Sequence, residues 1–271
     1  MDTKQNGLLF DCLWQPPPAG TVTELVAIAA RIAKKSQELR RQIVFTGSKV
    51  ASDAVHVYAP HEALPDLMDQ LAAGIRFEAP GVSPVDRVAV LGYYCVHAHP
   101  FKDGNGRWTR ALCLAVERRS LLKTVAAVSF QTVCPRALAE VVWPQTRVQG
   151  LRAYLEACNA YTERLLATYH QSPVRDSMNM MHEALRKAAK GPAKFQAISR
   201  LVFVNRKLDI AETKQLLGVS SRVAEGLFHT LAGCGLSETP GGLAVDSLLK
   251  EVDGYADVSA SFFTDNLKAS Q

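Results

Sequence analysis

The sequence predicts a mainly α-helical protein with two short β-hairpins. Alanine, leucine and valine dominate the composition, and apolar residues recur with the period of a helix more often than with that of a strand. Proline and glycine end the periodic segments, as at residues 16–18 and at Gly191 and Pro192. In residues 193–250, three short helical patterns precede two strand patterns around a Gly-Gly turn, which is typical of a winged helix-turn-helix.

The bulk properties limit the class of protein. The 271 residues (29.6 kDa) suffice for one large domain or two smaller ones, and the net charge of +5 permits a nucleotide or nucleic-acid partner without requiring one. No apolar run approaches the roughly 20 residues that cross a bilayer, and the N-terminus does not resemble a secretory signal. The six cysteines form no Cys-x-x-Cys pair, which favours buried thiols over a zinc site. We therefore expect a cytoplasmic protein with no membrane partner.

Three elements are expected in the first part of the chain. Residues 21–40 follow the triple proline and have the spacing of an amphipathic helix. In residues 43–59, β-branched and aromatic side chains flank a polar middle, which predicts a hairpin. A second helix should begin near Leu64 and Pro65, because proline suits the first helical turn.

The next helix has clear signals at both ends. Ser83 is a good N-cap, Pro84 suits the first helical position, and Asp86 stands three residues after the cap. Pro100 must end or kink this helix, because proline has no amide donor and disfavours helix in the residue before it. A new helix is expected over residues 105–122.

Further helices are expected over 135–143, 147–169 and 177–190, with a linker or kink at 171–177. In the C-terminal pattern, a helix over about 193–205 precedes one capped by Asp209 and ending at Gly218, and Ser220 or Ser221 caps a third. The predicted domains are an N-terminal helical segment (1–40), a catalytic domain (41–175), a connecting helix (176–192) and a winged helix-turn-helix-like domain (193–271).

Residues 99–110, with the sequence HPFKDGNGRWTR, hold the densest group of chemically useful side chains. His99 has an ordinary pKa near 6.5 and is a natural general base at neutral pH. Asp103 is a hard oxygen donor of the kind that suits Mg²⁺, which usually takes one or two carboxylates together with substrate phosphates.

The rest of the segment is suited to an anion. Gly104, Asn105 and Gly106 open a helix, so that their amides add to the positive end of the helix dipole. Arg107 and Arg110 share a face of that helix, and their guanidinium groups match phosphate oxygens. The segment therefore predicts a site for phosphoryl or nucleotidyl transfer.

This segment resembles the H-P-F-x-(D/E)-G-N-G-R-x-x-R motif of the Fic family of adenylyltransferases at every specified position. The similarity covers roughly residues 40–170. The resemblance implies a Fic-type helical domain with a small β-hairpin flap, which clamps the target segment by strand addition. Many Fic proteins also end in a winged helix, as residues 193–250 are expected to do.

The resemblance also implies a role for each motif residue. His99 would deprotonate a Ser, Thr or Tyr hydroxyl of a target protein, whose oxygen would attack the α-phosphate of ATP. Asp103 would hold Mg²⁺, the amides of residues 104–106 would cradle phosphate, and Arg107 and Arg110 would orient the β- and γ-phosphates. Phe101 would anchor the loop in the core.

Gly106 implies AMP transfer, because the related Doc type departs at the second motif glycine and transfers phosphate. Two positions depart from many Fic proteins, which have a histidine and an aromatic residue where this chain has Gly92 and Cys95. His97 should point to another helix face than His99.

Many Fic enzymes are inhibited by a glutamate in an (S/T)-x-x-x-E-(G/N) helix. Residues 221–226 match this pattern at Glu225, but the same residues fit the third helix of the winged domain. We therefore expect control by a separate small antitoxin-like protein, or no such control.

Other partners and activities remain open at this point. Arg222 and His229 are few contacts for DNA, so protein docking is favoured over DNA binding, and a homo-oligomer is possible. The rival readings are a Fic enzyme that uses another nucleotide or removes AMP, and a transcriptional regulator whose Fic part binds nucleotide. A sensor would not need His99, which argues against the regulator.

Overall fold

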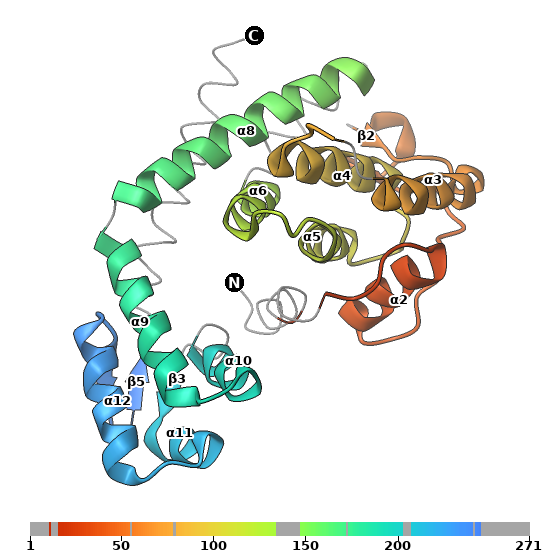
Figure 1. The fold of residues 1–271 in the computed structure, drawn as a ribbon. Coiled ribbons are helices and arrows are strands. Elements are labelled where there is room, and N and C mark those ends of the chain that lie inside the picture. Colours follow the sequence, from red (N-terminus) through yellow and green to blue (C-terminus); the bar gives the residue numbers. More distant parts are fainter. Residues whose placement is uncertain are drawn as a thin grey trace. The chain divides into compact units, whose positions relative to one another are not determined.

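A computed structural model of the protein describes residues 11, 16–54, 56–77, 80–133, 147–171, 173–202, 207–240 and 242–244, and these are mostly helical (Figure 1). They divide into two compact units, with the boundary after Leu166. No helix in these ranges is both long enough and apolar enough to cross a bilayer. The division into four domains expected from the sequence stays a prediction.

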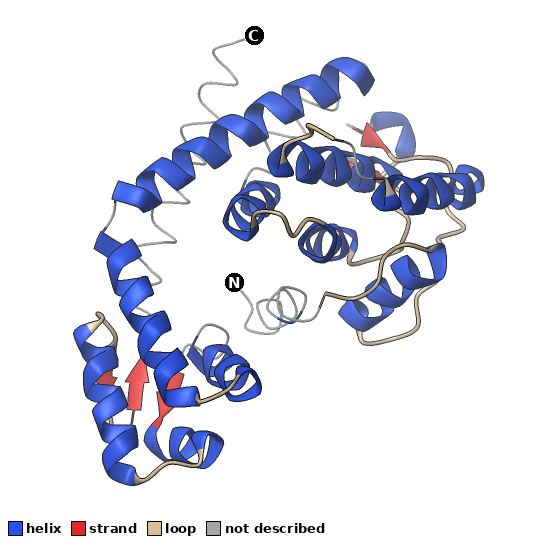
Figure 2. Cartoon of the chain, in the orientation of Figure 1, coloured by secondary structure: helices blue, strands red, loops and turns tan. Residues whose placement is uncertain are grey.

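The first unit is a group of helices with one short hairpin (Figure 2). Helices α4, α5 and α6 pack against one another, and α2 packs against α5. Strands β1 and β2 pair antiparallel with Phe45 opposite Val57, which confirms the hairpin expected over 43–59. The elements are α2 (Val22–Ala33), β1 (Phe45–Thr46), β2 (His56–Val57), α3 (Leu64–Arg76), α4 (Pro84–Ala98), α5 (Asn105–Val116), α6 (Leu121–Val133) and the first part of α8 (Arg147–Gln171).

Helix α2 begins with a capping box and is shorter than expected. The Glu24 amide donates to Thr21 Oγ1 at 3.2 Å, and the Thr21 amide donates to Glu24 Oε2 at 3.0 Å. The helix ends at Ala33, because Lys34 adopts the left-handed conformation with φ 55°. The expectation of a helix through residue 40 is therefore wrong, and the non-helical chain after Lys34 runs to the hairpin.

Helices α3 and α4 begin where the sequence indicates. Helix α3 starts at Leu64 with a proline in its first turn. Ser83 caps α4 by accepting a hydrogen bond from the Asp86 amide at 3.0 Å, and α4 ends at Ala98, two residues before Pro100. Both helix starts are confirmed.

The single helix expected over 105–122 is wrong, because it is broken between α5 and α6. Glu117 is fully buried there and accepts from the Arg119 amide at 2.8 Å and from Arg119 Nη2 at 2.7 Å. This carboxylate takes an amide that a continuous helix would bind to a carbonyl, so the chain turns. The helix expected over 135–143 lies outside the described residues.

Helix α8 agrees with the expectation for 147–169. Helix α9 (Pro173–Ala189) begins inside the stretch expected as a linker or kink, so residues 173–177 are helical and their assignment as linker is wrong. Proline fits there because the first helical turn needs no amide donor.

The second unit combines helices with a three-stranded sheet. Asp209 caps α11 by accepting from the amides of Ala211 at 2.8 Å and Glu212 at 3.0 Å, and α11 ends at Gly218 with φ 65°. β5 pairs antiparallel with both β3 and β4, so the strand order is β3-β5-β4. The elements after α9 are α10 (Pro192–Arg200), β3 (Lys207–Asp209), α11 (Ile210–Leu217), α12 (Ser221–Gly233), β4 (Ser237–Thr239) and β5 (Gly242–Ala244).

The two strands around the Gly-Gly turn and the caps of α11 are confirmed. Helix α10 ends at Arg200 and continues as a π-helical turn at residues 201–202, and the expected end at 205 lies outside the described residues. Strand β3 was not expected, because three residues ahead of a helix cap give no alternation to detect. Leu208 in β3 and Leu243 in β5 face each other and are buried in the core of the unit with Leu231.

Gly242→Ala is expected to destabilise the second unit. A Cβ at Gly242 would lie 2.2 Å from the Leu208 carbonyl oxygen and 3.1 Å from its carbon, so the backbones of β3 and β5 would have to separate. We expect a loss of about 1–3 kcal/mol in the free energy of unfolding, measured by urea denaturation. The control is Gly226→Ala in α12, where nothing lies within 4 Å, and it should gain up to about 1 kcal/mol. Equal stabilities of the two variants would contradict the argument.

Candidate active site

The loop between α4 and α5 begins at His99, which is the C-cap of α4. Its backbone is left-handed, with φ 44° and ψ 57°, and its amide donates to the Cys95 carbonyl at 3.0 Å. A left-handed C-cap turns the chain sharply away from the helix axis. His99 is half-buried in this position, and its side chain lies on the wall of a cavity.

This cavity has a volume of about 310 Å³, and only residues of the motif line it. It lies at the start of α5, where amides without helical partners gather. The structure brings every site residue expected from the sequence to this one place. The lining residues are His99, Lys102, Asp103, Gly104, Asn105, Gly106, Arg107 and Arg110.

Asn105 gives the loop its shape. Its side chain is buried, accepts from the Phe101 amide at 2.9 Å through Oδ1, and donates to the Phe101 carbonyl at 2.7 Å through Nδ2. Gly104, with φ 83°, makes the left-handed turn that precedes α5. Both ends of the Asn105 amide group are therefore used inside the loop, so what this residue can offer a ligand is its main-chain amide.

Phe101 and Trp108 anchor the loop to the core of the first unit. Both side chains are fully buried, and their rings meet edge to face with centroids 5.1 Å apart. Trp108 Nε1 donates to the Leu25 carbonyl of α2 at 3.0 Å. The start of α5 is therefore held between its own loop and α2, and the core position expected for Phe101 is confirmed.

Asp103 stands at the exposed side of the cavity. Its Oδ1 accepts from the Gly104 amide at 2.6 Å, and its Oδ2 lies 3.5 Å from Arg107 Nη2. The Asp103 side chain is 74% exposed, so this ion pair contributes little to stability and can open readily. Within the described part of the chain, no three His, Cys, Asp or Glu residues gather to hold a metal. A cation here would therefore need Asp103 together with ligand oxygens and water.

Arg107 and Arg110 give the cavity positive charge. Burial lowers the pKa of Arg110, and the neighbouring charge of Arg107 lowers it further. An arginine nevertheless stays protonated near neutral pH, so two guanidinium groups and a helix N-terminus meet at one cavity. This arrangement favours a multiply charged anion.

The His99 ring lies against Tyr58, the residue after β2. The two rings are stacked with centroids 3.9 Å apart and 28° between their planes. Burial lowers the pKa of His99 to about 4, and the charges of Arg40 and His56 act in the same direction, while a hydrogen bond to the Val96 carbonyl opposes them. His99 is therefore neutral at pH 7, with one ring nitrogen donating to Val96 and the other able to accept a proton.

Arg40 and Tyr58 contribute to the site, and the sequence analysis did not find them. Arg40 Nε donates to the His99 carbonyl at 2.7 Å, although the two residues are 59 positions apart. The sequence placed Arg40 at the end of an amphipathic helix and Tyr58 in a hairpin, where neither residue type suggests chemistry. Only the close approach of residues 40–59 to the end of α4 reveals their position.

Of the two positions that depart from the family pattern, Gly92 has an explanation in side-chain packing. A Cβ there would lie 2.4 Å from Gln131 Nε2 and 3.1 Å from Tyr154 Oη, so α6 and α8 occupy the space of a larger side chain. Cys95 is fully buried. His97 does not line the cavity and packs against Tyr93 with ring centroids 4.2 Å apart, as its helical position indicates.

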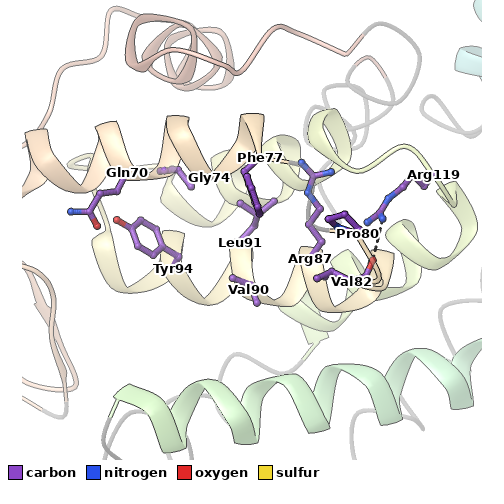
Figure 3. Close-up of a pocket in the computed structure, with 11 residues that line it drawn as sticks. Gln70, Gly74, Phe77, Pro80, Val82, Arg87, Val90, Leu91, Tyr94 and Arg119 are labelled. Carbon is purple, nitrogen blue, oxygen red and sulfur yellow. Dashed lines mark hydrogen bonds between the residues drawn. The ribbon is translucent and has the colours of Figure 1, made fainter.

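A second cavity, of about 550 Å³, lies between α3 and α4 and is separate from the motif (Figure 3). It is mainly apolar, and Phe77 on its wall is 67% exposed. Figure 3 shows Arg119 at one end of it, where Nη1 donates to the Val82 carbonyl at 3.1 Å. The residues of this cavity are Gln70, Leu71, Gly74, Phe77, Pro80, Val82, Arg87, Val90, Leu91, Tyr94 and Arg119.

The first unit is thus a helical domain with a positively charged cavity beside a neutral histidine. Residues 20–116 match the family model described as "Fic/DOC family". The match includes α2, which the sequence analysis left outside the similar region, and it ends at the last residue of α5.

Other comparisons add little. The chain is similar to the crystal structure of a Fic family protein from Desulfovibrio desulfuricans G20, with a TM-score of 0.44 and 17% identity over 87% of this chain and 71% of that one. A search of curated proteins found no match.

Proposed function

We propose that this chain transfers AMP from ATP to the hydroxyl of a Ser, Thr or Tyr residue in a target protein and releases pyrophosphate. The observation that carries the proposal is that a neutral histidine and two arginines line one cavity at the start of a helix. The match of residues 20–116 to the Fic/DOC family model supports it. We also place the protein in the cytoplasm, where ATP is abundant.

The proposed reaction uses the free nitrogen of the His99 ring. That nitrogen accepts the proton of the target hydroxyl while the hydroxyl oxygen bonds to the α-phosphorus of ATP. The bond from the α-phosphorus to the oxygen that bridges to the β-phosphorus breaks, and pyrophosphate leaves with the electron pair. The amides of Gly104, Asn105 and Gly106 and the side chains of Arg107 and Arg110 would orient the phosphates and stabilise the developing charge.

Asp103 would hold Mg²⁺ in this proposal. Its carboxylate is exposed at the cavity and is bound only to one amide and one surface arginine, so it fits a cation that shares phosphate oxygens with it. When bound, Mg²⁺ supplies positive charge to the leaving pyrophosphate. Asp103 thereby orients the charged end of the substrate, while His99 handles the proton.

The experiment uses ATP labelled at the α-phosphate or at the γ-phosphate with the full-length protein and a cell lysate. AMP transfer predicts that a protein band gains label from the α-labelled ATP only. Label from γ-labelled ATP would show phosphate transfer instead and would overturn the proposal. A gain of label with another α-labelled nucleotide, or loss of AMP from a modified protein, would favour the other enzymatic readings.

For the second unit, we propose a winged helix-turn-helix that docks protein more readily than DNA. Its support is the order α10, β3, α11, α12, β4, β5 with β5 between the other two strands. Arg222 and Glu225 both lie in α12 of the second unit. An experimental structure with another strand order would contradict the winged helix.

We further propose that a separate small protein inhibits the enzyme.

A further inference from the structure

Arg40 is a buried cation whose acceptors are all main-chain carbonyls. Only 6% of the residue is exposed, and no carboxylate in the described ranges forms an ion pair with it. Its side chain donates to the carbonyls of Gln42 at 2.6 Å, His99 at 2.7 Å and Ala98 at 3.3 Å, and also to that of Ala59. A charged donor without a carboxylate is costly to bury, so its retention calls for a specific reason.

We propose that Arg40 is a positioning residue for His99: its guanidinium holds the end of α4 and the end of the hairpin together and so fixes the histidine ring against Tyr58. This inference rests on the proposed role of His99 as the general base. It adds to that role a residue outside the motif, which acts through main-chain groups and does not touch the substrate.

The contacts of the backbone support this role. The Arg40 amide donates to the Pro100 carbonyl at 2.9 Å, so Arg40 binds the carbonyls of two consecutive residues, His99 and Pro100. The Ala59 amide donates to the His97 carbonyl at 3.2 Å, next to the Ala59 carbonyl that Arg40 binds. Hydrogen bonds therefore link residues 40, 59 and 97–100 into one group. Tyr58 precedes Ala59 in the chain, so this group places the Tyr58 ring against His99.

The planar fork of an arginine suits such a group, because its three nitrogens donate to four separate carbonyls. A lysine ammonium could keep the charge but has only three donors at one point. The charge and the hydrogen bonds of Arg40 can therefore be separated by substitution.

The positive charge of Arg40 also affects the protonation of the His99 ring. The Arg40 charge helps burial to hold the His99 pKa down at about 4, and the His56 charge acts in the same direction. Tyr58 stacks on the ring, and Lys102, Asp103, Arg107 and Arg110 line the same cavity as His99. A depressed histidine pKa favours the neutral base. Loss of the positive charge raises the His99 pKa toward its ordinary 6.5, so more of the base is protonated in mildly acid solution.

The test compares Arg40→Gln and Arg40→Lys in the full chain. Each variant is measured twice: by NMR titration of the His99 ring without nucleotide, and by the pH dependence of kcat/KM for AMP transfer. For Arg40→Gln we expect a higher His99 pKa, an acid limb moved to higher pH, and a rate lower by on the order of 10²-fold at pH 7. For Arg40→Lys we expect a His99 pKa close to that of the wild type and a rate at least about tenfold lower.

The matched control is Arg87→Gln at the other end of α4. Arg87 also bonds a main-chain carbonyl, that of Ile75 at 2.8 Å, and lies near the same Glu117 that Arg119 pairs with. It should lose stability without changing the His99 pKa or the acid limb. A similar shift in Arg87→Gln would show a general effect of unfolding.

Two results would overturn the inference. One is Arg40→Lys with the rate of the wild type, which would show that the four carbonyl contacts do not matter. The other is folded Arg40→Gln with an unchanged His99 pKa and rate. If the wild type transfers no AMP, the proposed function fails, but the NMR titration of Arg40→Gln and Arg87→Gln still tests whether Arg40 controls the His99 environment.

Discussion

We expect His99→Ala to lower kcat for the proposed AMP transfer by about 10²–10⁴-fold, which is the usual contribution of a positioned general base. Alanine removes the ring nitrogen proposed to accept the proton of the target hydroxyl. The proposed phosphate-binding parts of the cavity, Arg107, Arg110 and the amides at the start of α5, remain in place. The affinity for Mg-ATP, measured by calorimetry, should therefore change little while the rate collapses.

The control for this variant is His97→Ala. His97 lies on the same helix two residues earlier but packs against Tyr93 and does not line the cavity. It should transfer AMP at a rate close to that of the wild type. Equal losses in both variants, or a His99→Ala protein that keeps its rate, would remove His99 from its proposed role.

The pH dependence of the wild type follows from the same residue. In the proposed reaction the neutral form of His99 is the base, so kcat/KM should stay level from pH 8 to pH 6 and fall as the pH drops toward the pKa of about 4. An acid limb near the ordinary histidine pKa of 6.5 would contradict the effect of burial and of Arg40.

Trp108→Ala should lower the free energy of unfolding by about 3–5 kcal/mol, the largest loss of stability that we expect from one substitution here. The side chain is fully buried, meets Phe101 edge to face, and donates to the Leu25 carbonyl of α2. Alanine leaves a large cavity between α5, the loop and α2, and removes the hydrogen bond from the indole to the Leu25 carbonyl. Urea denaturation followed by far-UV circular dichroism measures the loss.

The graded control is Trp108→Phe, which keeps an aromatic ring against Phe101 and loses only the indole donor and part of the volume. Its loss should be clearly smaller than that of alanine. Because Trp108 sits in the first turn of α5, the alanine variant should also bind nucleotide weakly at temperatures where it is still folded. Similar stabilities for Ala and Phe would show that the ring does not hold the loop.

Local signals predicted a large part of the fold. Ser83, Asp209 and Gly218 mark helix ends because each cap needs only residues within one turn. The hairpin over 43–59 follows from residue type, and its short strands pair as expected. The motif residues also lie together for a local reason, since residues 99–110 are one loop and one helix start.

Other features could not be predicted, because they depend on contacts between distant segments. Glu117 ends α5 where it is buried beside Arg119 and lies 3.7 Å from Arg87, thirty positions earlier, although its own neighbourhood in the sequence permits a helix. Strand β3 exists because β5 pairs with it from more than thirty positions away. The early end of α2 is a third case, since it releases the chain that carries Arg40 to His99.

The sequence by itself therefore determined the chemical groups of the candidate site and their order, because a single continuous segment contains all of them. Only the tertiary structure decided the state of His99. Its burial, its stacking on Tyr58 and the nearby charge of Arg40 come from the hairpin and the segment before it. Desolvation and electrostatic interactions depend on distance in space, so a pKa near 4 cannot be inferred from the neighbours of a histidine along the chain.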